Sequence, residues 1–201
     1  MPQSRLFAAR LSARDLAQVA VFAALIAALG LPGSITIGIS GVPITLQTLG
    51  VIAAGAILGA RKGAAAVLVL LALVAIGLPL LAGGRGGLGV FAAASVGYLV
   101  GWVVGAAVIG ALTAHILPKY PLWAGLSVNA IGGILVIYIF GVIGVVLRTD
   151  LGIGAAIAST GAYVPGDAIK VVVATVVAKS VHRAYPGLIG SVRPTKAPAA
   201  A

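Results

Sequence analysis

The chain contains no cysteine and only three acidic residues among its 201 residues. Without cysteine it can form no disulfide, no thiolate metal site and no cysteine nucleophile. Asp15 and Asp150 lie at or beyond expected helix ends, which leaves little for catalysis by paired carboxylates. His115 and His182 have no acid or cysteine beside them, so their setting is not typical of a metal site. We therefore predict that the protein is not an enzyme and holds no metal or other cofactor.

Charged residues are scarce as a class, at 8% of the chain, whereas 61% of the residues are hydrophobic and 29 are glycines. This balance, with a mean hydropathy of +1.21, lies outside the range of ordinary soluble domains and is typical of membrane proteins with several spans. The net charge of +10 does not indicate a nucleic-acid partner, because the basic residues fall in gaps between apolar runs instead of gathering on one face with aromatic residues. The composition predicts an integral membrane protein.

Six apolar runs approach the length of about 20 residues that a helix needs to cross a bilayer. They cover residues 16–31, 46–59, 64–81, 90–117, 122–147 and 163–181. We predict an all-α polytopic membrane protein with one six-helix domain over residues 1–187 and a disordered cytoplasmic tail over 188–201. The segment "LPGSITIGISGVPIT" before the second run is rich in Gly and Pro, and we expect an irregular or re-entrant loop there.

The distribution of Lys and Arg predicts the orientation in the membrane. With six spans, most basic residues lie on one side, and only Arg85 and Arg148 fall in the opposite loops. The side that carries most of the basic residues should be cytoplasmic, and both termini lie on it. A cleaved signal peptide is the alternative for the first run, but its loss would put the remaining loops in conflict with the charge distribution. Ser12 and Asp15 fit a capping box that would start the first helix. The basic residues predicted to lie on the cytoplasmic side are Arg5, Arg10, Arg14, Arg61, Lys62, Lys119, Lys179, Arg183, Arg193 and Lys196.

An acid and a base lie three residues apart at the head of the sixth run. Tyr163, Asp167 and Lys170 share one helical stripe, which would descend into the membrane from the outer face. Ionisable side chains at that depth must be paired or face water. The pair is either a structural ion pair or a ligand site, in which the carboxylate accepts N–H bonds and the ammonium donates to an oxygen.

If this is a ligand site, other polar residues should lie at the same depth in the membrane, near the outer face. Gln47 and Thr48 open the second run at the outer face, Arg85 lies in an outer glycine-rich loop, and Tyr98 lies some way into the fourth run. Apolar walls with a few convergent polar groups describe a small-molecule pocket. Each residue also has a structural alternative: Gln47 as a helix cap, Arg85 as a solvated side chain, and Tyr98 as a packing residue.

No nucleotide-binding motif is supported. The run from Gly84 reads G-x-G-x-x-G but follows a membrane span, without a strand before it, and no acid follows about 20 residues later. A Walker A sequence is absent, so any ATP must be bound by partner subunits.

Small residues form a stripe along the first run. They recur at intervals of three or four residues, a spacing that lets another helix approach closely. The stripe either packs inside the protein's own bundle or docks a separate membrane protein. Its members are Ala13, Ala17, Ala20, Ala24 and Ala28.

The chain resembles the BioY family, the biotin-specific substrate-binding (S) components of energy-coupling factor (ECF) transporters. The resemblance is carried, in order, by "ARDLAQVAVFAAL", "GVPITLQTLGVIAAGAILGARKGA", "IGLPLLAGGRGGLGV", "GYLVGW" and "PGDAIK". It implies a six-helix S component in a prokaryotic cytoplasmic membrane with a biotin site near the outer face. It further implies a helix-one alanine surface that contacts a transmembrane coupling (T) component, with two ATPase subunits below.

The same resemblance implies a role for each site residue. Asp167 and Lys170 would bind the polar groups of biotin, Gln47 and Tyr98 would line the pocket, and Arg85 is a looser candidate for the valerate carboxylate. The residues by themselves support only a small polar-headed ligand that is bound from outside. An S component for another vitamin, a pore-forming or structural membrane protein and, more distantly, an intramembrane enzyme remain alternatives, and the oligomeric state stays open.

Overall fold

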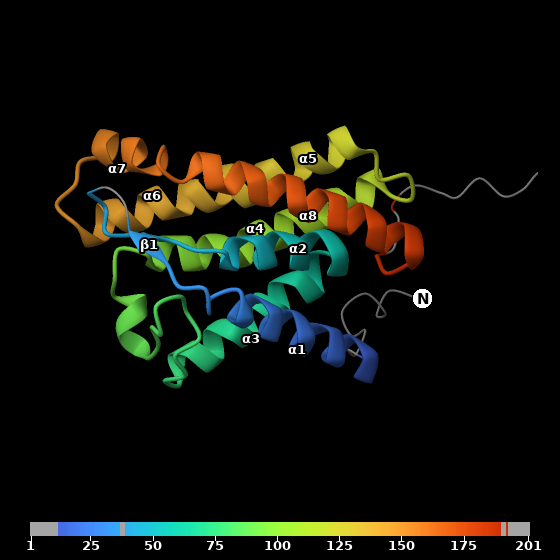
Figure 1. The fold of residues 1–201 in the computed structure, drawn as a ribbon, viewed down its shortest axis with the longest axis horizontal. Helices are drawn as coiled ribbons and strands as arrows, with labels where there is room; N and C mark the ends of the chain where they lie inside the picture. Colours follow the sequence, from blue (N-terminus) through green and yellow to red (C-terminus); the bar gives the residue numbers. More distant parts are fainter. Residues whose placement is uncertain (1–11, 37–38, 190–191, 193–201) are drawn as a thin grey trace, which may run out of the picture.

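The computed structural model describes residues 12–36, 39–189 and 192, and almost all of its regular structure is helical (Figure 1). Two two-residue strands pair antiparallel in the segment that joins the first two helices. The elements in chain order are α1 (Ala13–Ala28), β1 (Ile35–Thr36), β2 (Pro43–Ile44), α2 (Gln47–Leu58), α3 (Ala60–Ala75), the 3-10 helix η1 (Leu88–Phe91), α4 (Val96–Ile116), α5 (Leu122–Ala130), the π-helical turn η2 (Ile131–Val136), α6 (Ile137–Arg148), α7 (Ile153–Thr160) and α8 (Val164–Ala184).

Each of the six predicted runs contains a helix, so the prediction of an all-α fold is confirmed. Several predicted bounds were wrong. α3 begins at Ala60, because Arg61 and Lys62 are accommodated in its first turn, and it ends at Ala75, shortly before Gly77 takes a positive φ of 109°. Hydropathy reports apolar character and not the path of the backbone, so it could not find these ends.

Other differences concern breaks and a missed helix. The fourth run is divided into η1 and α4, and the fifth is a helix from Leu122 to Arg148 that is interrupted by the π-helical turn. The eight-residue α7 was not predicted, because its sequence is too short to form a span of its own. α7 and α8 meet at a bend of 50°.

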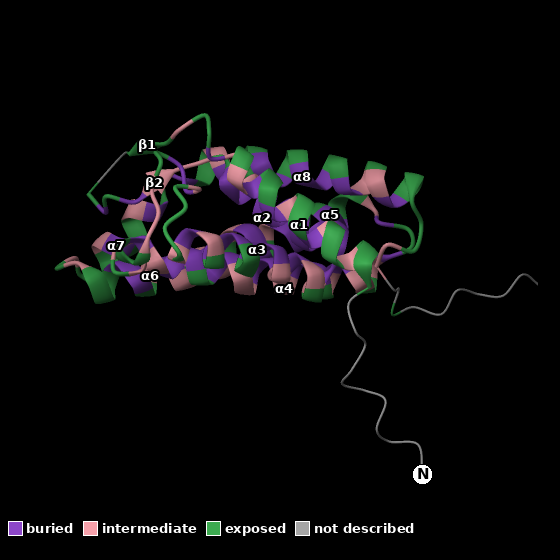
Figure 2. Cartoon of the chain, turned by 90° about the horizontal axis from the view of Figure 1, so that it is seen from below, coloured by how far each residue is buried: buried purple, intermediate pink, exposed green. Residues whose placement is uncertain are grey.

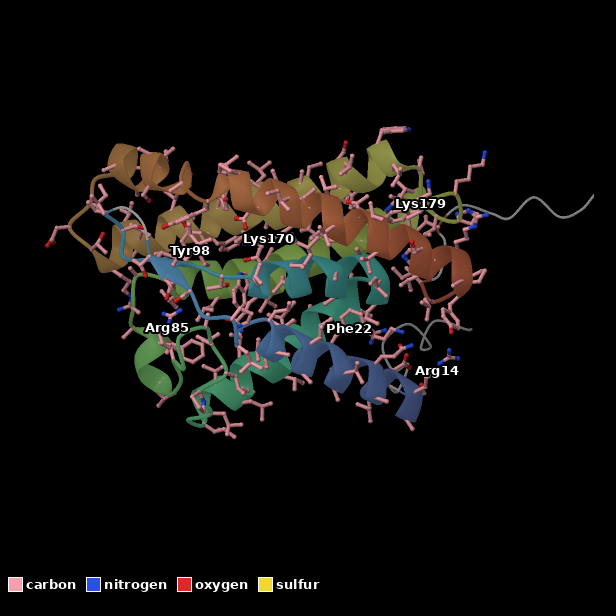
Figure 3. The ribbon with its side chains drawn as sticks, viewed as in Figure 1. Arg14, Phe22, Arg85, Tyr98, Lys170 and Lys179 are labelled. Atoms are coloured by element: carbon pink, nitrogen blue, oxygen red, sulfur yellow. The ribbon has the colours of Figure 1, made fainter. Side chains whose placement is uncertain are left out.

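Within the described residues, two helices are long and apolar enough to cross a membrane alone, Val96–Ile116 and Leu122–Arg148. The bent pair of α7 and α8 makes a third if it is counted as one span. The long elements run up and down the long axis, so that α1 begins at the same end of the molecule at which α8 finishes (Figure 1). Arg14 and Lys179 lie toward that end and Arg85 toward the other (Figure 3). This arrangement agrees with the charge distribution from which the orientation was predicted.

The outer faces of the helices are apolar, while the interior combines an apolar core with buried polar and charged side chains. α8 buries Asp167 and Lys170 on its inner face, while Ile169 and Val176 on its outer face are 66% and 52% exposed. Figure 2 shows buried residues between the helices and exposed ones on the outer sides of the bundle. Apolar side chains can face lipid tails at no cost, whereas charged side chains within the membrane need protein partners. The fold is that of a membrane protein.

Glycines bring α4 into backbone contact with the α5–α6 helix. Gly97, Gly101 and Gly105 recur every four residues on the face of α4 that meets this helix. A Cβ atom added at Gly97 would lie 2.8 Å from the Cα atom of Gly144, so the two backbones touch. Small residues at such spacing allow close packing between helices in membranes.

The predicted capping box of α1 is confirmed. The backbone N–H of Asp15 donates to the Ser12 hydroxyl at 3.2 Å, and the backbone N–H of Ser12 donates to the Asp15 carboxylate at 3.1 Å. Lys62 at the start of α3 also contacts Asp15 at 3.1 Å. The Ser12 hydroxyl and the Lys62 ammonium lower the pKa of Asp15 to about 2. These contacts join the first turns of α1 and α3.

The predicted tail lies mostly outside the described residues, as do Arg5, Arg10, Arg193 and Lys196. Of its described members, Leu188 and Ile189 pack against the core near α2. The backbone N–H of Val192 donates to the carbonyl of Ala114 at 3.1 Å.

Replacing Gly97 with Ala should destabilise the protein, because the added Cβ would meet the backbone of α6, which cannot move aside as a side chain could. Overpacking of this kind typically costs about 1–3 kcal/mol. Thermal unfolding in detergent should show a lower midpoint for Gly97→Ala.

The matched control is Gly154→Ala in α7, where a Cβ would meet nothing within 4 Å. Alanine favours a helix over glycine, so this change should be neutral or slightly stabilising. Equal unfolding midpoints for the two variants would contradict the packing argument.

Candidate ligand-binding site

A cavity lies between the helices, toward the end of the bundle that carries Arg85. Apolar walls with a few convergent polar groups are typical of small-molecule sites. All seven predicted ligand-binding residues line it: Gln47, Thr48, Arg85, Tyr98, Tyr163, Asp167 and Lys170. Segments that are far apart in the sequence therefore bring these side chains together.

The ion pair of α8 forms one wall of the cavity. Lys170 Nζ lies 2.7 Å from Asp167 Oδ1, and each side chain is only 7% exposed. The other carboxylate oxygen, Oδ2, accepts a hydrogen bond of 2.7 Å from the hydroxyl of Tyr138 in α6. Hydrogen bonds to ionised groups are among the stronger ones in proteins, and here they fix the carboxylate from two sides.

Three tyrosine rings that line the cavity pack together, and one of them, Tyr138, bonds this carboxylate. Tyr98, Tyr138 and Tyr163 contact one another edge to face, with centroid separations of 6.4, 6.0 and 6.3 Å. Gly141 leaves room for the Tyr98 ring, which a Cβ at that position would overlap. The buried Tyr98 hydroxyl has no hydrogen-bond partner within the described residues. Because an unsatisfied buried hydroxyl is costly, this group is well placed to bond a ligand atom.

The loop between α1 and α2 covers one side of the cavity. Tyr163 donates a hydrogen bond of 3.3 Å to the Val42 carbonyl, and its hydroxyl lies 2.7 Å from Ser40 Oγ. Val42, Pro43 and Ile44 line the cavity directly. The segment predicted to be irregular is thus largely so, apart from its two short strands, and it serves as a wall of the site.

Gln47 lines the cavity, but its amide is already engaged with backbone groups. Its Nε2 donates to the carbonyls of Ile26 at 3.1 Å and Leu80 at 3.0 Å, and its Oε1 accepts from the N–H of Ala82 at 2.9 Å. Both amide hydrogens are therefore used without a ligand. The residue joins α1, α2 and the glycine-rich loop that follows α3.

Arg85 reaches the cavity from that glycine-rich loop. Its Nε donates to the Ala82 carbonyl at 3.3 Å and its Nη1 to the hydroxyl of Ser95 at 3.4 Å. Partial burial lowers the pKa of the guanidinium. Arginine has five N–H donors, so donors remain for a carboxylate ligand.

Sequence reasoning missed Tyr138 and Trp102, which also line the cavity. Tyr138 was the one hydroxyl-bearing side chain in the middle of the fifth apolar run, a signal that was available. Trp102 lies four residues after Tyr98 and therefore on the same face of α4. The contact of Tyr138 with Asp167 could not be found this way, because helical periodicity does not say which helices are neighbours.

The alanine stripe lies on the outside of the bundle. Ala13, Ala17, Ala20, Ala24 and Ala28 are all exposed, whereas α1 packs inward through Val19, Ala23 and Ile26. The alternative in which the stripe packs within the protein's own bundle is therefore wrong.

Fold and site together define a class: an all-α polytopic membrane protein with a small-molecule cavity near one end. A sequence model of the BioY family matches residues 2–187. The chain belongs to the BioY family, and the resemblance found in its sequence is confirmed.

Named relatives and a solved structure agree with this assignment. The chain is 47% identical over 181 residues to the biotin transporter BioY of Rhizobium etli, covering 88% of this chain and 97% of that one. It is 43% identical to the biotin transporter BioY of Rhodobacter capsulatus, covering 88% and 97% of the two chains. The crystal structure of the S-component for biotin from an ECF-type ABC transporter matches with a TM-score of 0.82 and 30% identity, over 87% of this chain and 93% of that chain. The relatives are transporters, which confirms the prediction that the chain is not an enzyme.

Replacing Lys170 with Met should destabilise the fold more than removing both members of the pair. The single change leaves a buried carboxylate whose charge is uncompensated, and breaking a buried pair in this way costs about 3–5 kcal/mol. The double variant Lys170→Met with Asp167→Leu leaves no buried charge and should unfold at a higher temperature than the single variant.

Lys179→Met is the control on the same helix, because Lys179 forms no ion pair within the described part of the chain. It should unfold close to the wild type. A Lys170→Met variant as stable as this control would show that the pair contributes nothing to the fold.

Proposed function

We propose that this protein is the biotin-binding S component of an ECF-type ABC importer in a prokaryotic cytoplasmic membrane. It captures biotin from the outer face and delivers it inward together with a T component and two ATPase subunits. The observation that carries the proposal is the buried Asp167–Lys170 pair, which lines a cavity with convergent polar groups in a chain of the BioY family.

The polar groups of the cavity suit the ureido ring of biotin. That ring offers two N–H donors and one carbonyl acceptor. A carboxylate has about four lone-pair positions, so Asp167 can accept ureido N–H bonds while it keeps its bonds to Lys170 and Tyr138. Lys170 and the hydroxyl of Tyr98, which no described residue bonds, are donors for the ureido carbonyl.

The remaining walls suit the rest of the ligand. Leu99, Trp102 and Ile137 present apolar surface for the thioether ring and the aliphatic chain. Arg85 lies on the loop at the same end and offers a guanidinium to the terminal carboxylate, a pairing for which its planar fork is suited.

Transport requires that the loaded site changes its exposure. We assign capture to the end of the bundle at which the α1–α2 loop and the glycine-rich loop enclose the cavity. The exposed alanine stripe of α1 is the surface for a T component, because small residues allow a second helix to pack closely. The chain has no Walker A sequence, so ATP hydrolysis belongs to the ATPase partners.

Replacing Asp167 with Asn should weaken biotin binding at least tenfold, because the charge-assisted acceptor is lost and the Lys170 charge is left uncompensated. Calorimetric titration of detergent-purified protein with biotin measures this directly. We expect a stoichiometry near one for the wild type.

Asp150→Asn, a change at an exposed acid outside the cavity, is the control and should bind as the wild type does. Competition by another vitamin with no response to biotin would indicate an S component of different specificity. If the well-folded wild type shows no saturable binding of any vitamin, the Asp167–Lys170 pair is a structural ion pair and not a ligand site.

Replacing Ala20 and Ala24 together with Leu should spare biotin binding and impair assembly. The bulky side chains would keep a partner helix at a distance from the exposed face of α1. Co-purification with a co-expressed ECF-type T component and its ATPases is the measurement.

Leu at the exposed Ala158 and Ala168 of α7 and α8 is the matched control and should leave assembly intact. Normal co-purification of the variant changed at Ala20 and Ala24 would contradict the assignment of the alanine stripe as the surface for the T component.

A further inference from the structure

The side chain of Gln47 occupies a junction between three parts of the structure. It is 1% exposed and belongs to the first turn of α2. Its three hydrogen bonds reach the end of α1 at Ile26 and the glycine-rich loop at Leu80 and Ala82. All of these partners are backbone groups, so the bonds fix the course of the chain and not merely a neighbouring side chain.

A continuous hydrogen-bonded path leads from this amide to Arg85. The N–H of Ala82 donates to Gln47 Oε1 at 2.9 Å, and the carbonyl of the same residue accepts from Arg85 Nε at 3.3 Å. Arg85 then donates to Ser95 Oγ at 3.4 Å. One residue, Ala82, therefore stands between the amide of Gln47 and the guanidinium.

The loop that carries Arg85 is also closed by two backbone hydrogen bonds between Leu81 and Arg85 and by one from Gly87 to Val74. The bonds of Gln47 to Leu80 and Ala82 flank Leu81 and attach this closed turn to α2.

Gly83, Gly84 and Gly87 all have positive φ angles, and a Cβ at Gly84 or Gly87 would meet nothing within 4 Å. Glycines lose more conformational freedom on ordering than other residues, so this loop is costly to hold in one conformation. On the α1 side, Gly30 leaves the room that the Gln47 amide occupies, because a Cβ there would lie 3.0 Å from Nε2.

We propose that Gln47 is a positioning residue that holds Ala82 and, through it, the guanidinium of Arg85 at the cavity. The functional part of this inference rests on the proposed function, in which Arg85 faces the carboxylate of biotin. The same amide is bonded to the carbonyl of Ile26 near the end of α1. The position of Arg85 therefore also depends on the position of α1, the helix that carries the exposed alanine stripe.

The first test is a double-mutant cycle of Gln47→Leu and Arg85→Gln, titrated with biotin and with biotin methyl ester, which lacks the carboxylate charge. Gln47→Leu should weaken biotin binding at least tenfold and the binding of the ester less than threefold. With Arg85→Gln already in place, Gln47→Leu should cost less than a further threefold, because residues that act through one path are not additive. Equal losses for the two ligands, or additive effects, would overturn the proposal.

The second test needs no ligand and therefore stands if biotin does not bind. Amide hydrogen exchange across residues 80–87 should be faster in Gln47→Leu than in the wild type, with the exchange of α4 and α8 unchanged. Gln18→Leu is the matched control, since Gln18 bonds Lys62 near the start of α1, at the other end of that helix. Wild-type exchange of residues 80–87 in Gln47→Leu, or the same acceleration in Gln18→Leu, would contradict the positioning role.

Gln47→Glu separates positioning from a general loss of folding. As a neutral buried carboxyl, it keeps the size of the side chain and an oxygen to accept from Ala82, but it can donate to only one of the two carbonyls that Nε2 serves. Residues 80–87 should therefore exchange more slowly than in Gln47→Leu and faster than in the wild type. If Gln47→Leu does not fold, the two ligands decide in Gln47→Glu: a greater loss of affinity for biotin than for its methyl ester supports the path through Ala82, and equal losses, or no loss, contradict it.

Discussion

The buried ion pair between Asp167 and Lys170 is the constraint on which the arrangement of this bundle depends. Charges on a helix in lipid must find protein partners, and this pair lines the cavity together with Tyr98 of α4, Tyr138 of α6 and Tyr163, whose hydroxyl bonds the α1–α2 loop. With the pair buried, most valines of α8 face outward, although Val171 is buried with the pair. The pair therefore constrains the rotation of α8 and supplies charged groups to the site.

Close packing makes this arrangement possible around α4. The glycines of α4 bring its backbone against the α5–α6 helix, and Gly141 leaves the space that the Tyr98 ring fills. Membrane helices gain little from the hydrophobic effect against one another, so contacts of this kind and buried hydrogen bonds carry much of their association. The cavity persists near one end, where loops in place of helices complete the walls.

The site and the exposed face of α1 are joined by hydrogen bonds as well as by packing. Gln47 contacts the backbone of α1 and of the Arg85 loop with one amide, while Ser40 and Val42 hold the other covering loop through Tyr163. Both loops that cover the cavity are thus attached to groups at its rim. The cavity and the exposed face of α1 therefore share contacts through one buried side chain.

The sequence by itself determined the membrane class, the all-α fold, the family and seven of the residues that line the cavity, because hydropathy, charge and motif are properties of the chain that need no coordinates. It could not determine the start of α3, because a helix can include charged residues such as Arg61 and Lys62 in its first turn. Nor could it determine the end of α3, the existence of α7 or the π-helical turn, since apolar residues continue across those breaks. The tertiary structure decided that Tyr138 bonds Asp167, that the alanine stripe faces outward and that the Gln47 amide holds backbone groups. These facts depend on which helices are neighbours and how each is rotated, and a helical period fixes only which residues share a face.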